Sequence, residues 1–333
     1  MKIKSINLYK CKEAFKSPII TPKIELTERE SLFIEIVTHD DQTFYGECNA
    51  FDTTWYADET ILTVQRQLKK WIPQVIDKNF ATFESWLPFL KQLEPTPATR
   101  ATVVMAIYQM YHQLFSFEVE YGATVNGLTP MQLDTLKKTK PKRVKLKWSP
   151  NLNHNLNVIR ALNLNNHIAI DANESLSIDN FSKIKQLNTG DIIYIEEPFK
   201  LMTELDLIDL TNYPAIAIDE KASSIRNILS IINEYPIEVV VLKPFRLGGI
   251  DKMLEIIEIL KKRGIQFVVG GMYEFGLSRY FTAMLAKEGD CPGDVTPQGY
   301  YFYEDIVNDS GILKEGLIYF NPPQVNQSKL KRL

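Results

Sequence analysis

Hydrophobic and polar positions divide the chain into two parts with different periods. In the first part, an alternating N-terminal run precedes a predicted hairpin over 31–38 and 42–48, with a polar turn at 39–41. Apolar residues then recur at helical spacing over about 59–75 and 99–115. Strands followed by helices predict an α+β module, which we place at residues 1–118.

Beyond residue 119, short apolar runs rich in β-branched residues alternate with helical stretches. The runs lie at 143–147, 167–171, 192–196, 215–219, 239–243 and 266–270, with further strands expected near 122–126 and 293–295. This alternation predicts βα units and a parallel sheet. A doubly wound open sheet should offer a glycine-rich first turn, but neither GxGxxG nor GxxxxGK[ST] occurs. We therefore predict an α/β protein with a (β/α) barrel over 119–310.

Each of the middle βα units ends its strand with an ionisable residue. Lys147, Asp171, Glu196, Asp219 and Lys243 follow one another at intervals of 24, 25, 23 and 24 residues. In a barrel, the carboxyl ends of the strands gather around one mouth, where barrel active sites lie. The spacing therefore predicts that these five side chains share one site.

Asp171, Glu196 and Asp219 are the candidate metal ligands. Carboxylates that meet at one mouth repel one another unless a cation neutralises them, and hard oxygen donors suit Mg²⁺, with Mn²⁺ as a substitute. The alternative is that each acid only caps the helix after its strand, which is the weaker interpretation for three acids in phase. Alternation along the strand makes Glu196 the inward residue, and we expect Glu197 to cap a helix or support the ligands.

Lysines complete the predicted site. Lys145 and Lys147 share one face of a strand, and Lys243 arrives from the far side of the barrel. Solvated lysines on an edge strand are the ordinary alternative, but a closed barrel has no such edge. Mutual repulsion and a nearby metal ion would lower the pKa of a lysine toward the range of a general base. The set predicts removal of a proton next to a carboxylate, with the metal stabilising the resulting enediolate.

Composition narrows the class of protein further. The 333 residues carry a net charge of −3 with a pI near 5.9, so nothing attracts nucleic acid or an anionic membrane in bulk. No run reaches the roughly 18 apolar residues of a membrane span, and the N-terminus lacks the apolar run of a signal peptide. Three widely spaced cysteines without CxxC disfavour a disulfide framework or a zinc site. We expect a cytoplasmic protein that binds a small-molecule carboxylate, and a homo-oligomer stays open.

These residues resemble the signature series of a known family. The series Lys145-Leu146-Lys147, Asp171-Ala172-Asn173, Glu196-Glu197-Pro198, Asp219-Glu220 and Lys243-Pro244 is similar to that of the muconate-lactonizing subgroup of the enolase superfamily. The segment 270–274, Pro292-Gly293-Asp294, and Gly46-Glu47-Cys48 with Trp55-Tyr56 more specifically resemble the o-succinylbenzoate synthases and the similar N-succinylamino acid racemases. The resemblance runs over nearly the whole chain.

The resemblance implies a modified TIM barrel whose mouth is capped by residues 1–118 and rejoined by residues 311–333. The implied reaction is syn-dehydration of 2-succinyl-6-hydroxy-2,4-cyclohexadiene-1-carboxylate to o-succinylbenzoate in menaquinone synthesis. Lys147 would remove the α-proton and then protonate the leaving hydroxide, and Lys145 would tune it or touch the carboxylate. Lys243 would support the enediolate, while the three carboxylates hold magnesium.

Segments around 15–20 and 50–56 resemble loops that close over substrate. Phe15, Trp55 and Tyr56 are therefore candidates for lining the substrate, with packing in an aromatic core as an equal alternative. The matching motifs add Met272, and they add Asn173, which the resemblance places just outside the metal ligands.

Lys221 is a departure from the family pattern, because serine often follows the Asp-Glu pair in relatives. By alternation Lys221 could face the mouth together with Asp219, or it could belong to a capping helix. We expect a solvated loop lysine.

Other functions would use similar residues. Racemisation of N-acylamino acids needs a base on each face, which Lys147 and Lys243 could supply. A muconate-type cycloisomerase or a dipeptide epimerase would share the skeleton, although dipeptide epimerases usually show an Asp-x-Asp that 270–294 lacks. A Schiff-base aldolase needs a desolvated lysine but not three carboxylates in phase. A non-catalytic barrel protein should have lost a ligand or a lysine, and none is missing.

Overall fold

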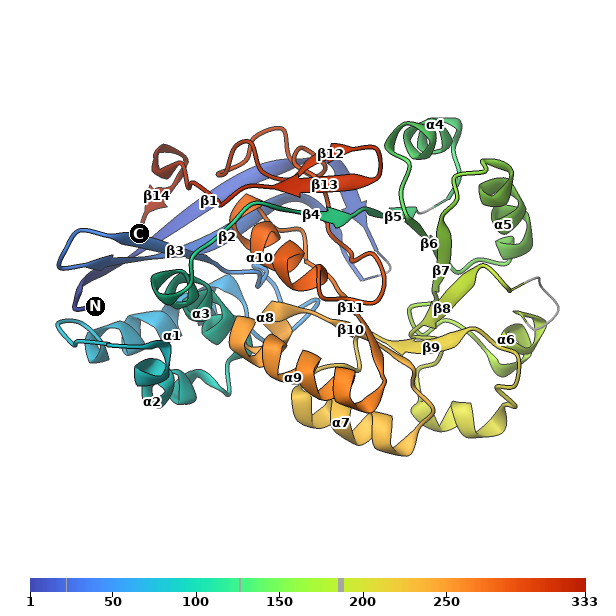
Figure 1. Ribbon diagram of the computed structural model, residues 1–333, viewed down its shortest axis with the longest axis horizontal. Coiled ribbons are helices and arrows are strands. Elements are labelled where there is room, and N and C mark those ends of the chain that lie inside the picture. Colours follow the sequence, from blue (N-terminus) through green and yellow to red (C-terminus); the bar gives the residue numbers. More distant parts are fainter. Residues whose placement is uncertain (22, 126, 185–188) are drawn as a thin grey trace.

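Three β-sheets organise the chain, which the computed structural model describes over residues 1–21, 23–125, 127–184 and 189–333 (Figure 1). The first sheet is antiparallel. In spatial order it contains β14 (Lys331–Arg332), β1 (Ile3–Ile20), β2 (Glu25–Thr38) and β3 (Thr43–Glu47). β2 and β3 form the predicted hairpin, and β2 begins earlier than expected because it continues its pairing with the long strand β1.

Helices of the N-terminal part confirm the two predicted ones with shorter bounds. These two are α1 (Ile61–Trp71) and α3 (Pro97–Tyr111), and the short helix α2 (Leu87–Leu90) between them was not predicted. Short 3₁₀ helices in the chain cover Ile72–Gln74, Phe83–Trp86, Lys91–Leu93, Met202–Leu207 and Gln327–Lys329. α3 is buried along most of its length, since it lies between β3 and the short helix α8 (Pro244–Leu247). It therefore packs the N-terminal part against the segment that follows Lys243 directly.

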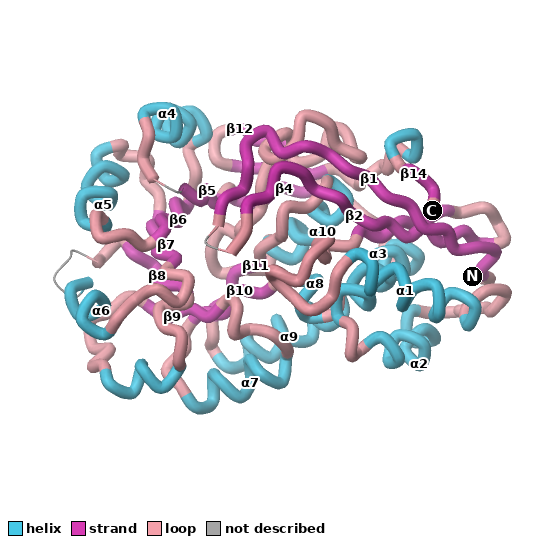
Figure 2. Tube along the Cα trace, turned by 180° about the vertical axis from the view of Figure 1, so that it is seen from behind, coloured by secondary structure: helices cyan, strands magenta, loops and turns pink. Residues whose placement is uncertain are grey.

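The second sheet is parallel and curls into most of a barrel (Figures 1 and 2). In spatial order it contains β11 (Gln266–Val269), β10 (Val239–Leu242), β9 (Ala215–Ile218), β8 (Ile192–Glu196), β7 (His167–Asp171), β6 (Arg143–Lys147) and β5 (Gly122–Val125). These are the predicted strands, although the expected end of β5 at Asn126 lies outside the described residues. The strand expected over 293–295 was wrong, because only a single bridge joins Asp294 to Gly270.

The seam of the barrel lies between β5 and the segment around Asp294. A Cβ atom on Gly122 would stand 2.7 Å from the carbonyl oxygen of Gly293, so only glycine allows this close approach. Asp294 also binds Arg143 and Lys145 of β6 through its two carboxylate oxygens. Side chains therefore join the two sides of the seam where strand pairing stops.

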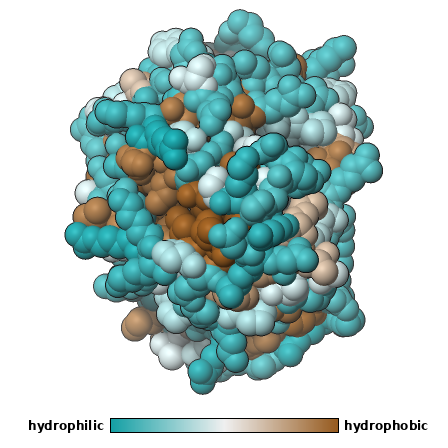
Figure 3. All heavy atoms as spheres, turned by 90° about the vertical axis from the view of Figure 1, so that its left-hand side faces the viewer, coloured by the Kyte–Doolittle hydropathy of each residue, from teal (hydrophilic) through white to brown (hydrophobic). Residues whose placement is uncertain are grey.

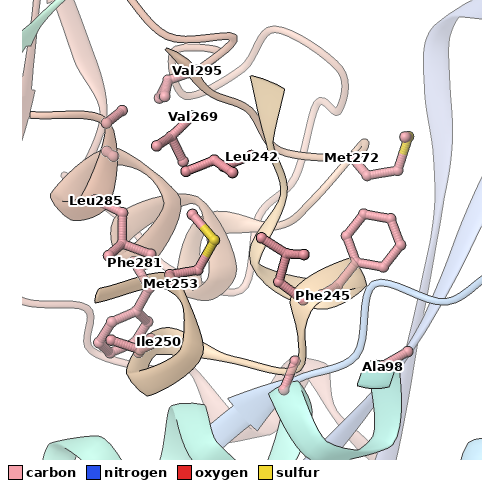
Figure 4. Packing of buried hydrophobic residues seen from close by; sticks show 14 of the residues in the cluster. Ala98, Leu242, Phe245, Ile250, Met253, Val269, Met272, Phe281, Leu285 and Val295 are labelled. Carbon is pink, nitrogen blue, oxygen red and sulfur yellow. The ribbon is translucent and has the colours of Figure 1, made fainter. Parts of the chain in front are cut away.

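Helices surround the parallel sheet on its outer face (Figures 1 and 2). They are α4 (Pro130–Thr139), α5 (Leu152–Ala161), α6 (Ile178–Ile184), α7 (Ile225–Glu234), α9 (Ile250–Arg263) and α10 (Gly276–Ala286). Behind β10 and β11, Met253, Phe281 and Leu285 pack around Leu242 and Val269 (Figure 4). Burial of these apolar side chains is what holds the helices on the sheet.

The inner face of the parallel sheet has a separate apolar layer. Ala169, Tyr194, Ala217 and Val241 belong to a small buried cluster that is distinct from the main core. Side chains alternate along a strand, so the residues two positions later point to the same side. They are Asp171, Glu196, Asp219 and Lys243. The predicted site residues therefore form the next layer toward the mouth.

A third sheet and the chain ends complete the fold. The antiparallel sheet contains β12 (Ile312–Lys314), β13 (Leu317–Phe320) and β4 (Phe117–Glu120), and β14 pairs with β1. The predicted α/β barrel with an N-terminal α+β part is confirmed, whereas the boundaries at 118 and 310 stay predictions.

The surface gives two further observations. On the side that carries both termini, the surface is mostly hydrophilic, and its largest hydrophobic area lies near the middle (Figure 3). Subunits often bury such areas, but a homo-oligomer stays a prediction. Within the described ranges, no helix is long and apolar enough to cross a membrane.

Candidate active site at the barrel mouth

Lys147 ends β6 and lies beside the end of β7. Its ammonium group donates to Asp171 and to the side-chain oxygen of Asn173 at 2.7 Å. Pairing of β6 with β7 places Lys147 opposite Asp171, so the contact follows from the register of the sheet. The Lys147 side chain is 35% exposed and Asp171 only 4%, so the amino group faces the open mouth.

Lys145 lies one layer deeper and is buried. It donates to both oxygens of Glu196 at 3.1 Å and to Asp294 at 2.7 Å, and Asp294 also accepts from Arg143 at 2.5 Å. Burial alone would lower the pKa of Lys145, but the charges of Asp294 and Glu196 outweigh it and raise the pKa well above its ordinary value. Without a metal ion the surrounding carboxylates therefore keep Lys145 protonated, and the lowering expected beside a bound metal stays a prediction.

Lys243 follows β10 and is also buried. It donates to Asp219 at 2.7 Å and to the hydroxyl of Tyr56 at 2.9 Å, and Arg246 donates to the same carboxylate at 2.9 Å. Burial would raise the pKa of Asp219, but Lys243 and Arg246 outweigh it and lower the pKa to about 2. The pKa of Lys243 is itself raised, since the charge of Asp219 outweighs the effect of burial, as suits a group that stays positively charged. Tyr56 brings the N-terminal part into direct contact with this side of the mouth.

The three predicted ligands Asp171, Glu196 and Asp219 offer the oxygen donors that Mg²⁺ prefers. In the part of the chain that the structure describes, no three His, Cys, Asp or Glu side chains converge closely enough to hold an ion as they stand. Each predicted ligand is instead hydrogen-bonded to an ammonium group. Burial raises the pKa of Glu196 to about 8 against the effect of Lys145, and repulsion from Asp171 and Asp219 adds to the rise. A divalent cation would relieve this repulsion, so the donor set fits one.

Glu197 and Lys221 lie on the other side of the ligand layer. Glu197 accepts from the backbone N–H of Asp219 at 2.6 Å, in agreement with the expectation that it supports the ligands. The Lys221 side chain is 15% exposed and binds Glu197 at 2.5 Å and Glu174 at 2.7 Å. The expected solvated lysine was therefore wrong, because two carboxylates of neighbouring loops hold it in partly buried ion pairs.

Predicted substrate-lining residues lie in two places. Phe15 packs against the rings of Phe302 and Tyr273, with centroids 5.2 and 5.9 Å apart, so it belongs to an aromatic core. Trp55 stacks edge-on against Phe51 at 4.9 Å. Met272 contributes to a pocket of about 460 Å³ of empty space that is partly open to solvent.

This pocket adjoins the layer of predicted site residues. Its walls include Thr124, Asp294, Tyr300 and Tyr301, and Asp294 is the residue that binds Lys145. A substrate at the mouth could therefore extend part of its structure between these tyrosines.

Sequence reasoning missed Arg143, Arg246 and Asp294 as site residues. Arg143 precedes Lys145 by two positions and therefore shares its face of β6, and Arg246 follows Lys243 by three. Asp294 stands in the motif Pro292-Gly293-Asp294, which had suggested only a resemblance. The position of each residue in the sequence places it near the site, but nothing in the sequence indicates which side chain it contacts.

Comparisons with known proteins show to which family the chain belongs. Residues 132–321 match the family model described as enolase C-terminal domain-like. The o-succinylbenzoate synthase of Bacillus subtilis is 27% identical over 339 residues, which cover 96% of this chain and 91% of the relative. The N-succinylamino acid racemase of Thermus thermophilus is 26% identical over 286 residues, which cover 79% and 77%.

A solved structure shares the whole fold. A dipeptide epimerase from Enterococcus faecalis, complexed with Mg and the dipeptide L-Leu-L-Tyr, superimposes with a TM-score of 0.80 at 18% identity. The superposition covers 99% of this chain and 100% of the epimerase. Because the family model spans more than half of its length, the chain belongs to the enolase C-terminal domain-like family.

Proposed function

We propose that the chain is a carbon–oxygen lyase that converts 2-succinyl-6-hydroxy-2,4-cyclohexadiene-1-carboxylate to o-succinylbenzoate, a step of menaquinone synthesis. One observation carries the proposal: Lys147 ends β6, Lys243 follows β10 with three strands between the two, and each lysine contacts a carboxylate of the mouth. Two nitrogen groups that face one substrate carbon suit proton removal next to a carboxylate. Similarity to the Bacillus subtilis synthase over most of both chains supports this choice of reaction.

Lys147 is the base in this proposal. Its contacts with Asp171 and Asn173 aim the nitrogen into the mouth, where part of the side chain is exposed. As a neutral amine it takes the α-proton, and as an ammonium it returns that proton to the hydroxyl that leaves from the same face. The C–H and C–O bonds break, a C=C bond forms, and water departs.

Lys243 acts as a fixed positive charge on the opposite side. It is held by Asp219 and Tyr56, and Arg246 adds a second cation beside the same two residues. Negative charge spreads onto the substrate carboxylate when the α-proton leaves, and preorganised cations stabilise that charge in the transition state.

Asp171, Glu196 and Asp219 would hold Mg²⁺, which Mn²⁺ could replace. When bound there, a divalent cation supplies positive charge to the substrate carboxylate. The presence of Mg in the similar epimerase structure supports this assignment. Lys145 would keep the carboxylate of Glu196 oriented, because it donates to both oxygens of Glu196 and is itself held by Asp294.

Racemisation of N-succinylamino acids is the second candidate. It is favoured by the lysine on each side of the mouth and by the similarity to the Thermus thermophilus racemase. The surroundings of the two lysines favour the reaction that needs one base. The Lys243 side chain is 8% exposed and enclosed by its partners, whereas that of Lys147 is 35% exposed.

The test compares the two reactions on one preparation. Purified protein with Mg²⁺ in deuterated water is given either the cyclohexadiene substrate or an N-succinyl-L-amino acid, and products and α-deuterium are followed by NMR. We expect dehydration with a kcat of about 10 s⁻¹ and slower or no racemisation. Racemisation without dehydration would make the chain a racemase, and inactivity toward both substrates would refute the proposal.

A further inference from the structure

Lys221 lies behind the ligand layer and uses all three of its ammonium protons. Its Nζ atom donates to Glu174 at 2.7 Å, to Glu197 at 2.5 Å and to the carbonyl oxygen of Phe199 at 2.8 Å. An ammonium group has three donors and no acceptor, so these contacts satisfy it completely. The acceptors belong to the loops that follow β7 and β8, whereas Lys221 itself follows β9. One side chain therefore joins three successive loops of the barrel mouth.

Glu197 transmits this contact to a predicted ligand. One of its oxygens accepts from Lys221, and the other accepts from the backbone N–H groups of Asp219 at 2.6 Å and of Lys221 at 3.3 Å. Glu197 is only 1% exposed, so its charge needs a partner in place of water. Lys221 supplies that partner, and the carboxylate in turn fixes the backbone from which the Asp219 side chain projects.

Glu174 connects Lys221 to its neighbour Asn173, which is the hydrogen-bond partner of the proposed base Lys147. Asn173, Glu174 and Glu197 have φ angles of 43°, 60° and 45°, in the left-handed region that side chains other than glycine avoid. Such residues persist when their surroundings hold them. The N–H of Glu174 donates to the carbonyl oxygen of Glu197 at 2.7 Å, and Lys221 bridges the two carboxylates. Asn173, the neighbour of Glu174, accepts from Lys147.

We propose that Lys221 is a positioning residue that locks these strained loops, so that Asp219 and Asn173 face the mouth in a fixed arrangement. This inference rests on the proposed function, since it gives Asp219 the role of a ligand and Asn173 that of a partner of the base. Lys221 acts through Glu197 and Glu174 rather than by touching the substrate. Its removal should therefore weaken metal binding and turnover more than it weakens substrate binding.

The test replaces Lys221 by methionine, which keeps the length of the side chain and removes its charge. The matched control is Lys262→Met, which breaks an exposed pair with Glu258 on the outside of the barrel. Mg²⁺ affinity is measured by titration calorimetry on metal-free protein, and kcat and KM are measured for dehydration. We expect Lys221→Met to weaken Mg²⁺ binding and lower kcat by about 10- to 100-fold each, with KM changed less than about threefold. Lys262→Met should match the wild type.

A second variant keeps the inference testable where Lys221→Met fails to fold. The double variant Lys221→Met with Glu197→Gln removes both charges of the buried pair, so no unpaired carboxylate is left in the interior. It should fold, as judged by circular dichroism, and should still show the weakened Mg²⁺ binding because Asp219 has lost its charged support. Wild-type Mg²⁺ affinity and kcat in whichever of the two variants folds would overturn the inference.

The outcomes separate the two proposals. A wild-type protein that binds Mg²⁺ but does not dehydrate the substrate refutes the proposed reaction, and the Mg²⁺ affinities still decide the role of Lys221. A wild-type protein that binds no Mg²⁺ refutes the ligand assignment and this inference together.

Discussion

The barrel mouth and the start of α10 both bury carboxylates, but they surround them with different partners. At the mouth, Asp171, Glu196 and Asp219 each contact an ammonium group. Near α10, Glu47 accepts from the backbone N–H groups of Phe275 and Ser278, both at lengths of 2.7–2.8 Å. Burial by itself therefore does not distinguish a catalytic carboxylate from a structural one.

The second region continues with Glu274 and Asp305, and we call these two residues and Glu47 the α10 acid cluster. Glu274 accepts from the hydroxyls of Ser278 and Thr282, while Asp305 accepts from the N–H of Gly276 and pairs with Arg279. Most of these donors are neutral. They tie β3 of the N-terminal part to a barrel helix.

The comparison shows how the charge of the neighbouring donors affects the protonation of a buried carboxylate. Two side-chain cations, Lys243 and Arg246, hold Asp219 ionised. Burial raises the pKa of Glu47 to about 8 against the effect of its backbone donors, and it does the same to Glu196 against the effect of Lys145. Changes at the mouth should therefore reduce activity more than stability. Changes in the α10 acid cluster should do the reverse.

The largest effect is expected for Lys147→Ala. Loss of the proposed base should lower kcat for dehydration by about 1000-fold, within the range that general acid–base catalysis contributes. The side chain is partly exposed, so the free energy of unfolding should change by less than about 1 kcal/mol. Steady-state kinetics and urea unfolding measure the two quantities, with the exposed Lys137→Ala as control. Retention of more than a tenth of the activity would remove Lys147 from the role of base.

Removal of divalent metal should have the next largest effect. After dialysis against a chelator, kcat should fall by about 100-fold or more, because the charge on the substrate carboxylate loses its support. Added Mg²⁺ should restore turnover and also raise the melting temperature, since an ion that binds only the folded state stabilises it. In Glu196→Gln, both responses to Mg²⁺ should weaken together. Full activity in the chelated protein would contradict the metal assignment.

Tyr56→Phe should have a smaller effect on the same side of the site. The variant removes the hydroxyl that accepts from Lys243 at 2.9 Å and from Arg246 at 3.2 Å. A hydrogen bond to a charged group contributes about 1.5–3 kcal/mol, so kcat should fall by about tenfold or somewhat more. Tyr303→Phe, at a tyrosine that is 80% exposed, is the control and should be silent. Equal kinetics for the two variants would show that the contact between Tyr56 and Lys243 has no part in turnover.

The sequence allowed prediction of those site residues whose positions are determined by the strands of the barrel. Because strands alternate, Asp171, Glu196 and Asp219 could be placed on one face before any coordinates, and the inner cluster at Ala169, Tyr194 and Ala217 explains why. The barrel followed from the same alternation of strands and helices. The side of the sheet to which a residue at a strand end points was predictable, because it depends only on the alternation of side chains along that strand.

Contacts between distant segments could not be predicted in this way. Asp294 meets Arg143 across 151 residues of sequence and Tyr56 meets Lys243 across 187, and no period connects such pairs. Lys221 was misjudged because its partners lie on left-handed turns, whose direction no alternation rule gives. Tertiary packing decides these contacts, so they appear only when the strands are assembled.

The smallest effect on activity is expected for Glu47→Gln, which tests the other side of the comparison. Burial raises the pKa of Glu47 to about 8, against the effect of the N–H groups of Ser278 and Phe275. In the unfolded chain the carboxyl has its ordinary pKa near 4.5. Between these two pH values the folded protein therefore keeps a proton on Glu47 that the unfolded chain releases. The contribution to stability is therefore complete below pH 4.5 and is lost as the pH rises toward 8, by up to about 1.4 kcal/mol per pH unit. Urea unfolding from pH 5 to 9 should show this decline in the wild type and in the exposed control Glu25→Gln, but a flatter profile in Glu47→Gln. kcat at the optimum should change by less than about threefold, because Glu47 contacts α10 and not the mouth. A profile as steep in Glu47→Gln as in the wild type, or a large loss of kcat, would mean that the two buried acid regions do not divide stability and catalysis between them.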